Sequence, residues 1–189
     1  MIQRKKKSKY NLLILKALEF FIENPYTEIY LREFSRKLKI SPNTAQRFLD
    51  LFLKEKLVIE VKKANLRYFK ANLNSNLFKH MKIAFSIGKI EKFGLIKNLK
   101  NHVSHCILFG SVAKGLDDEK SDIDLLIITD NKKMAREILL EHINKFHREI
   151  NYHIFSWVEW KNQKKNNLAF YQDVIANGIN LIGEIPIVD

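Results

Sequence analysis

Leu108–Thr129 reads LFGSVAKGLDDEKSDIDLLIIT and places polar groups directly beside two apolar runs. The first run ends at Gly110 and Ser111, and the second begins between Asp122 and Asp124. Apolar runs of roughly four to eight residues that are bounded by turn residues are typical of buried strands. We therefore expect two core strands, one ending in a glycine–serine turn and the other beginning with a pair of aspartates.

The side chains of Asp122 and Asp124 are expected to point to the same side of the second strand. Residues i and i+2 of a strand share a face and are separated by about 6.6 Å along it. Both carboxylates can therefore converge on one site beside the Gly110–Ser111 turn. Such a pair suits Mg²⁺, which is bound through one or two carboxylates together with substrate phosphates. A cation there would also offset the cost of placing two charges against an apolar core.

The Gly110–Ser111 turn is suited to holding a phosphate. Gly110 has no Cβ, so the backbone can turn sharply and approach a ligand. Ser111 adds a hydroxyl, the residues after it can begin a helix, and Lys114 is a further candidate for a phosphate contact. Gly110 and Gly115 have the spacing of a P-loop, but Leu116 and Asp117 stand where that motif requires Lys and Ser or Thr, which excludes it.

Strand and helix patterns alternate around this stretch. Strands are predicted over residues 105–109, 123–129, 150–155 and 180–182. A helix is predicted between the second and third of them, from the apolar positions Ala135, Ile138, Leu139, His142, Ile143 and Phe146. This order of elements predicts a mixed arrangement of sheet and helices in the second half of the chain.

Composition limits the class of protein. The chain has 189 residues, of which 46% are hydrophobic and 29% are charged, as expected for a globular protein of one or two domains. No apolar run approaches the roughly 20 residues that span a bilayer. The single cysteine, Cys106, excludes a disulfide framework and lies in an apolar run, so we expect it to be buried. We expect a cytoplasmic protein with no membrane partner.

The positive charge is concentrated in the first part of the chain. Residues 1–80 contain 18 Lys and Arg and 7 Asp and Glu, a net charge of +11, whereas the whole chain carries +12. A basic segment joined to a nearly neutral one suggests a module that binds a polyanion, attached to a second module.

The basic half shows the pattern of a DNA-binding domain. Helices are predicted over residues 11–23 and 31–38, and a third begins after Ser41 and Pro42, with Ala45, Phe48, Leu49, Phe52 and Leu53 on its inner face. Its outer face carries Asn43, Thr44, Gln46 and Arg47, which can bind bases or phosphates. A hairpin with its turn near Ala64 follows, and its tip carries Lys62, Lys63 and Arg67.

Residues 8–72 therefore resemble a winged helix-turn-helix domain. The resemblance implies that the third helix enters the major groove of duplex DNA and that the hairpin contacts the DNA backbone or the minor groove. Proteins of this kind often bind as dimers. Four apolar residues of the connecting helix could pack between domains or form a homodimer seam: Leu77, Met81, Ala84 and Phe85. Such binding should weaken steeply as salt concentration rises.

The motif FGSVAKG followed by DIDLLI resembles the signature of the DNA polymerase β-type nucleotidyltransferase superfamily. The similarity covers about residues 90–183 and is closest to the minimal nucleotidyltransferases that carry an N-terminal winged helix. It implies that Gly110 and Ser111 hold the triphosphate of a nucleotide, of which ATP is the first candidate, while Asp122 and Asp124 bind Mg²⁺. It also implies transfer of a nucleotidyl group to a hydroxyl, and a protein acceptor is one option.

One departure from the superfamily concerns its third carboxylate, which lies on a neighbouring strand. The matching segment here is REINYHIFS, in which Asn151 stands at the expected acidic position. Glu149 could replace it as the general base from the start of the strand, or His153 could accept the proton. This departure keeps open a domain that binds nucleotide without turning it over.

Three functions remain after these observations. The leading one is a Mg²⁺-dependent nucleotidyltransferase with a DNA-binding domain. The alternative is a transcriptional regulator whose transferase-like domain senses nucleotide, and the third is a DNA-binding protein with a purely structural second domain. The expected fold is α+β, with a winged helix-turn-helix over residues 1–74, a connecting helix over 75–89 and a mixed-sheet nucleotidyltransferase domain over 90–189.

Overall fold

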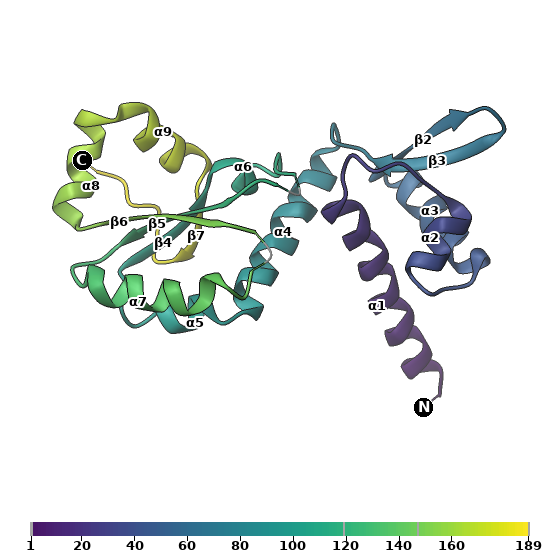
Figure 1. The fold of residues 1–189 in the computed structure, drawn as a ribbon, viewed down its shortest axis with the longest axis horizontal. Helices are drawn as coiled ribbons and strands as arrows, with labels where there is room; N and C mark the ends of the chain where they lie inside the picture. Colours follow the sequence, from purple (N-terminus) through teal and green to yellow (C-terminus); the bar gives the residue numbers. More distant parts are fainter. Residues whose placement is uncertain (1, 119, 147, 189) are drawn as a thin grey trace. The chain divides into compact units, whose positions relative to one another are not determined.

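A computed structural model describes residues 2–118, 120–146 and 148–188 (Figure 1). The chain forms two compact units, Met1–Lys79 and His80–Asp189. The boundary between them falls inside the helix α4 (Asn76–Lys92). Among the described residues, no helix combines the length and the apolar character that crossing a membrane requires.

The N-terminal unit is a winged helix-turn-helix. Its elements are α1 (Ile2–Glu23), β1 (Ile29–Tyr30), α2 (Leu31–Lys37), α3 (Pro42–Lys54), β2 (Val58–Lys63) and β3 (Leu66–Ala71). The strands form an antiparallel sheet in the order β1-β3-β2, and β2 and β3 make a hairpin with a turn at Ala64 and Asn65. The first helix begins at Ile2, whereas the sequence pattern predicted a start at residue 11.

The side chains of α3 explain why this helix forms and how it packs. The hydroxyl of Ser41 accepts a hydrogen bond from the backbone N–H of Thr44 at 3.2 Å, and Pro42 occupies the first helical position. On the inner face, Phe48 and Phe52 are buried together with Ala45 and Leu49. Full burial of one such large side chain contributes about 1.5–3 kcal/mol. The polar face of α3 is therefore left pointing outward.

The C-terminal unit contains a four-stranded mixed sheet. Its remaining elements are α5 (Leu95–Leu99), β4 (His105–Phe109), α6 (Gly110–Ala113), β5 (Ile123–Ile128), α7 (Lys132–Ile143), β6 (Ile150–Phe155), α8 (Trp157–Asn166), α9 (Leu168–Asn177) and β7 (Ile179–Ile182). The strand order is β6-β5-β4-β7; β5 and β6 are parallel, and the other pairs are antiparallel. The α+β class expected from the sequence is confirmed, with each strand boundary within one residue of its prediction.

Helices cover both faces of this sheet. On one face α5 and α7 pack against Leu108, Leu125 and Ile127, and on the other α8 and α9 pack against Leu126 and Ile128 (Figure 1). Because successive strand residues point to opposite faces and both faces are covered, the strands are continuous apolar runs. The sheet therefore gives the polar groups at its end a rigid support.

Cys106 lies in β4 and is fully buried, as the sequence predicted. Burial raises the pKa of its thiol to about 12 because the thiolate is poorly solvated in an apolar environment. The thiol is therefore neutral near pH 7 and contributes packing rather than nucleophilic chemistry.

Candidate functional site

The Gly110–Ser111 turn lies where β4 ends, and it passes very close to Asp124. Gly110 has φ +73° and begins the short helix α6. A Cβ on this residue would lie 2.2 Å from Oδ2 of Asp124. Glycine is therefore required here twice, by the left-handed backbone and by the approach of the carboxylate.

Asp122 and Asp124 flank the first residue of β5. Asp124 pairs with Phe109 of β4 on one side and with Asn151 of β6 on the other, and Asp122 directly precedes the strand. Both side chains are half-buried. The pairing confirms that the turn and the two carboxylates meet at one end of the sheet, as the sequence pattern predicted.

The electrostatics of the pair favour a cation. Desolvation by burial raises the pKa of Asp124, and the charge of Asp122 raises it further. The amide of Asn151, and more weakly the charges of His153 and Arg148, act in the opposite direction. Two hard oxygen donors in a partly desolvated position, with a glycine backbone against one of them, fit the coordination preferences of Mg²⁺.

Asn151 of β6 lies beside the two aspartates. Its side-chain Nδ2 donates a hydrogen bond to Oδ2 of Asp122 at 2.9 Å. Because its neutral amide lies opposite Asp124 in the strand register, the site contains two carboxylates bridged by an amide rather than three carboxylates. The pairing of β5 and β6 places Asn151 beside Asp124, and its correspondence to an acidic residue of the superfamily stays a prediction.

Glu149 lies just before β6 with an exposed side chain. Its backbone carbonyl accepts a hydrogen bond from the N–H of Ile123 at 2.9 Å, which places it beside the start of β5. In the part of the chain that the structure describes, no three His, Cys, Asp or Glu residues form a group that could hold a metal ion. Glu149 thus does not complete a three-carboxylate cluster, and its role as a base stays a prediction.

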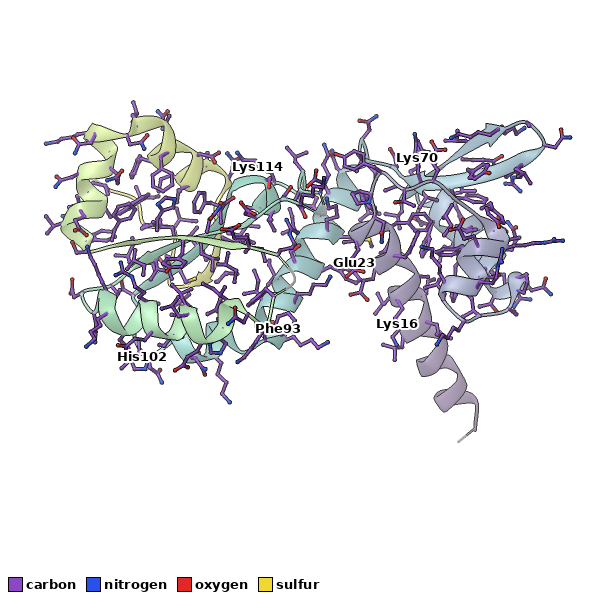
Figure 2. All side chains as sticks on the ribbon, in the orientation of Figure 1. Lys16, Glu23, Lys70, Phe93, His102 and Lys114 are labelled. Carbon is purple, nitrogen blue, oxygen red and sulfur yellow. The ribbon has the colours of Figure 1, made fainter. Side chains whose placement is uncertain are left out.

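Lys114 forms an ion pair within the C-terminal unit. It follows α6 (Figure 2), and its Nζ lies 2.5 Å from Oδ1 of Asp173 on α9. Both side chains are one-third exposed, and the bond to Lys114 is the main reason that the pKa of Asp173 is lowered. A phosphate would therefore compete with Asp173 for this lysine, whereas Ser111 is half-buried in the turn itself.

On the predicted DNA-binding face of α3, two residues are exposed and two others form hydrogen bonds within the protein. Asn43 and Arg47 are exposed on it. The other two already have partners in the protein: the hydroxyl of Thr44 lies 2.9 Å from that of Ser41, and Gln46 donates to Asp50 at 2.7 Å. Asn43 and Arg47 are therefore the two predicted DNA contacts of this face whose side chains are exposed.

Of the three predicted DNA-binding cations of the hairpin, one is exposed near the tip and two form ion pairs within the unit. Lys62 is exposed near its tip. Lys63 lies 2.5 Å from Glu28, and Arg67 lies 2.6 Å from Glu60 across the hairpin. Hydrogen bonds from these cations lower the pKa of both glutamates, so two of the three predicted DNA-binding charges are partly neutralised within the unit.

Sequence reasoning missed three charged residues near the aspartate pair: Lys82, Asp117 and Arg148. Asp117 was regarded only as a residue that breaks a P-loop motif, and Lys82 as part of a helix between two domains. Charged residues in polar or amphipathic segments usually lie in water, so no local signal marked them.

Part of the C-terminal unit is similar to a known protein family. A model of the family described as polymerase beta, nucleotidyltransferase matches residues 93–185. A search of curated proteins found no match.

Three solved structures are similar to parts of the chain. Reduced HlyU from Vibrio cholerae N16961 is 20% identical with a TM-score of 0.30, over 43% of this chain and 90% of that one. A toxin–antitoxin structure with AMP-PNP is 20% identical with a TM-score of 0.35, over 52% and 73%. A Sulfolobus solfataricus protein described as a nucleotidyltransferase is 14% identical with a TM-score of 0.29, over 54% and 80%.

Proposed function

Because residues 93–185 match the family model described as polymerase beta, nucleotidyltransferase, we propose that the C-terminal unit transfers a nucleotidyl group from a Mg²⁺-bound nucleoside triphosphate to a hydroxyl acceptor. The acceptor oxygen forms a bond to the α-phosphorus, and the bond from that phosphorus to the leaving pyrophosphate breaks. The proton of the acceptor passes to a base, for which Glu149 is the candidate.

The observation that carries this proposal is the contact between the Gly110 backbone and the carboxylate of Asp124. It brings a turn suited to a phosphate within reach of two acidic oxygens, in a place where a side chain would not fit. Asp122 and Asp124 would hold the cation. When bound, the cation would neutralise negative charge on the phosphates of the nucleotide. The turn with Ser111 would orient the triphosphate, and the sheet would keep both parts in register.

The direct test is incubation of the pure protein with each of the four α-³²P-labelled nucleoside triphosphates and Mg²⁺. Label transferred to the protein or to an added acceptor, with release of pyrophosphate, would support transfer and identify the preferred base. ATP is the first candidate. Nucleotide binding without pyrophosphate release in the presence of protein, DNA and RNA acceptors would contradict it.

A second function is favoured by Asn151. Since an amide replaces the third carboxylate and donates a hydrogen bond to Asp122, the site is also suited to binding a nucleotide without turnover. The protein would then be a DNA-binding regulator that responds to nucleotide. A change in DNA affinity on adding a non-hydrolysable nucleotide, together with no transfer, would distinguish this function from the first.

Replacing Asn151 by aspartate tests the role of this position. A third charged oxygen should raise the affinity for Mn²⁺, measured by electron paramagnetic resonance, on the order of tenfold. In chelator-treated protein the same change should lower the free energy of unfolding, because the hydrogen bond to Asp122 is replaced by repulsion. Asn162→Asp on the exposed side of α8 is the matched control. If Asn151→Asp kept the wild-type affinity for Mn²⁺ and the wild-type free energy of unfolding, position 151 would not face the cation.

For the N-terminal unit, we propose binding to duplex DNA through α3 and the hairpin. The support is the net charge of +11 in residues 1–80 and the exposed face of α3. We also propose that the protein binds as a homodimer to a DNA site with two halves, which a measurement of its oligomeric state tests. For the C-terminal unit, a protein hydroxyl is one proposed acceptor, and the molecule that carries the ³²P label after the transfer reaction tests it.

Replacing Arg47 by alanine should weaken DNA binding by about 1–3 kcal/mol, because this side chain is exposed on the helix expected to enter the groove. Lys62→Ala should instead reduce the slope of log affinity against log salt by about 1. Fluorescence anisotropy over a salt series measures both. Lys97→Ala removes one charge from α5 of the other unit and should leave binding unchanged. Equal affinities for Arg47→Ala and wild type at all salt concentrations would contradict the assignment.

A further inference from the structure

Three charged residues of the C-terminal unit contact one another: the buried Lys82 and Asp117 and the partly exposed Arg148. Asp117 is 5% exposed and Lys82 is 1% exposed. The Nζ of Lys82 lies 3.1 Å from Oδ1 of Asp117 and also donates to its backbone carbonyl. From the other side, Nη1 of Arg148 donates to Oδ2 of Asp117 at 2.8 Å. The carboxylate of Asp117 is thus held between two cations from distant parts of the chain.

Arg148 extends this contact to the aspartate pair. Its Nε donates to the backbone carbonyl of Ser121 at 2.5 Å, and Ser121 is bonded directly to Asp122. The hydroxyl of Ser121 in turn donates to Oδ1 of Asp118 at 2.8 Å, which closes the loop on itself. A continuous set of contacts therefore runs from Lys82 through Asp117 and Arg148 to the residue that precedes Asp122.

Stability alone does not account for these residues. Removing charges from water costs several kcal/mol per ion, and well-packed apolar side chains of similar size are often equally or more stabilising. A polar arrangement nevertheless has directional bonds, which can hold a loop in one conformation. The loop in question carries the first carboxylate of the candidate site, where a displacement of a fraction of an ångström matters.

We propose that Asp117, Lys82 and Arg148 are positioning residues that set the place of Asp122 for binding a divalent cation. This inference rests on the proposed function of the carboxylate pair. Lys82 lies in α4, outside the segment 93–185 that the family model matches. The nucleotide-binding unit of this protein therefore includes part of α4, because α4 supplies one of the two cations that fix Asp117.

The test compares Asp117→Asn and Lys82→Met in the full chain with a control at the far end of β5. Thr129→Val removes the hydrogen bond from Thr129 to the carbonyl of His102, which is 2.8 Å long. All three changes should lower the urea midpoint. Only Asp117→Asn and Lys82→Met should weaken binding of Mn²⁺ alone, by about tenfold or more, as outer contacts of metal ligands do.

Hydrogen exchange of the backbone amides of residues 120–124 supplies a readout that needs no cation. It should quicken in Asp117→Asn and Lys82→Met and stay unchanged in Thr129→Val. If Asp117→Asn does not fold, the double variant Lys82→Met/Asp117→Leu restores apolar packing and should still lose Mn²⁺ affinity.

The two proposals fail in different ways. Wild-type Mn²⁺ affinity and wild-type exchange in the variants would overturn the positioning role. Absence of Mn²⁺ binding by the wild-type protein would overturn the proposed cation site instead, and the exchange data would still decide whether the loop depends on Asp117.

Discussion

The double variant Asp122→Asn/Asp124→Asn is expected to lose nucleotidyl transfer by about a thousandfold or more. Asparagine keeps the shape of both side chains but removes the two charges that would hold the cation and, through it, the phosphates. The measurement is release of pyrophosphate under saturating nucleotide and Mg²⁺. DNA binding by the N-terminal unit should stay at its wild-type level.

The stability of this variant provides an internal check. Burial raises the pKa of Asp124, so its ionised form is disfavoured in the folded protein, and this cost grows as pH rises through the ordinary range of a carboxyl. An asparagine at the same position has no charge to bury. In chelator-treated protein at pH 7, the free energy of unfolding should therefore be equal to or higher than that of wild type.

Asp130→Asn is the matched control, since Asp130 is exposed beyond the other end of β5. It removes the same kind of charge and should keep both transfer and stability. Transfer by the double variant at the wild-type rate would show that the chemistry lies elsewhere. Loss of transfer in Asp130→Asn as well would point to net charge rather than to the site.

Replacing Gly110 by alanine should damage both the fold and the site. The left-handed backbone, with φ +73°, costs an alanine about 1–2 kcal/mol. In addition, its Cβ would lie 2.2 Å from Oδ2 of Asp124, so the carboxylate or the turn must move. We expect a lower urea midpoint and a loss of Mn²⁺–nucleotide binding that exceeds what the lower stability explains.

Gly88→Ala is the control for this change. Gly88 lies inside α4, and apart from its chain neighbours and the nearby backbone of the helix no described atom lies within 4 Å of the place where its Cβ would be. Alanine should raise stability there by about 0.5–1 kcal/mol and leave nucleotide binding unchanged. If Gly110→Ala bound Mn²⁺ and nucleotide like wild type, the close approach of the turn to Asp124 would have no functional role.

The sequence by itself determined the elements around the site and the residues at its centre. Strand periodicity predicts that Asp122 and Asp124 share a face, and the apolar runs on either side of the motif are long enough to identify buried strands. The position of Asn151 also followed from sequence, because it is the second residue of an equally clear strand. These signals are local, so they do not depend on how distant segments meet.

Only the tertiary structure decided which charged side chains pair with one another inside the protein. Lys63 pairs with Glu28, Lys114 with Asp173, and Asp117 with Lys82, in each case across at least 35 positions of the chain. Long-range pairing of this kind leaves no periodic pattern, because any solvated lysine or aspartate has the same local sequence. The sequence therefore determined where the carboxylates lie along the chain, whereas the fold decided which cations neutralise one another and which residues hold Asp122 in place.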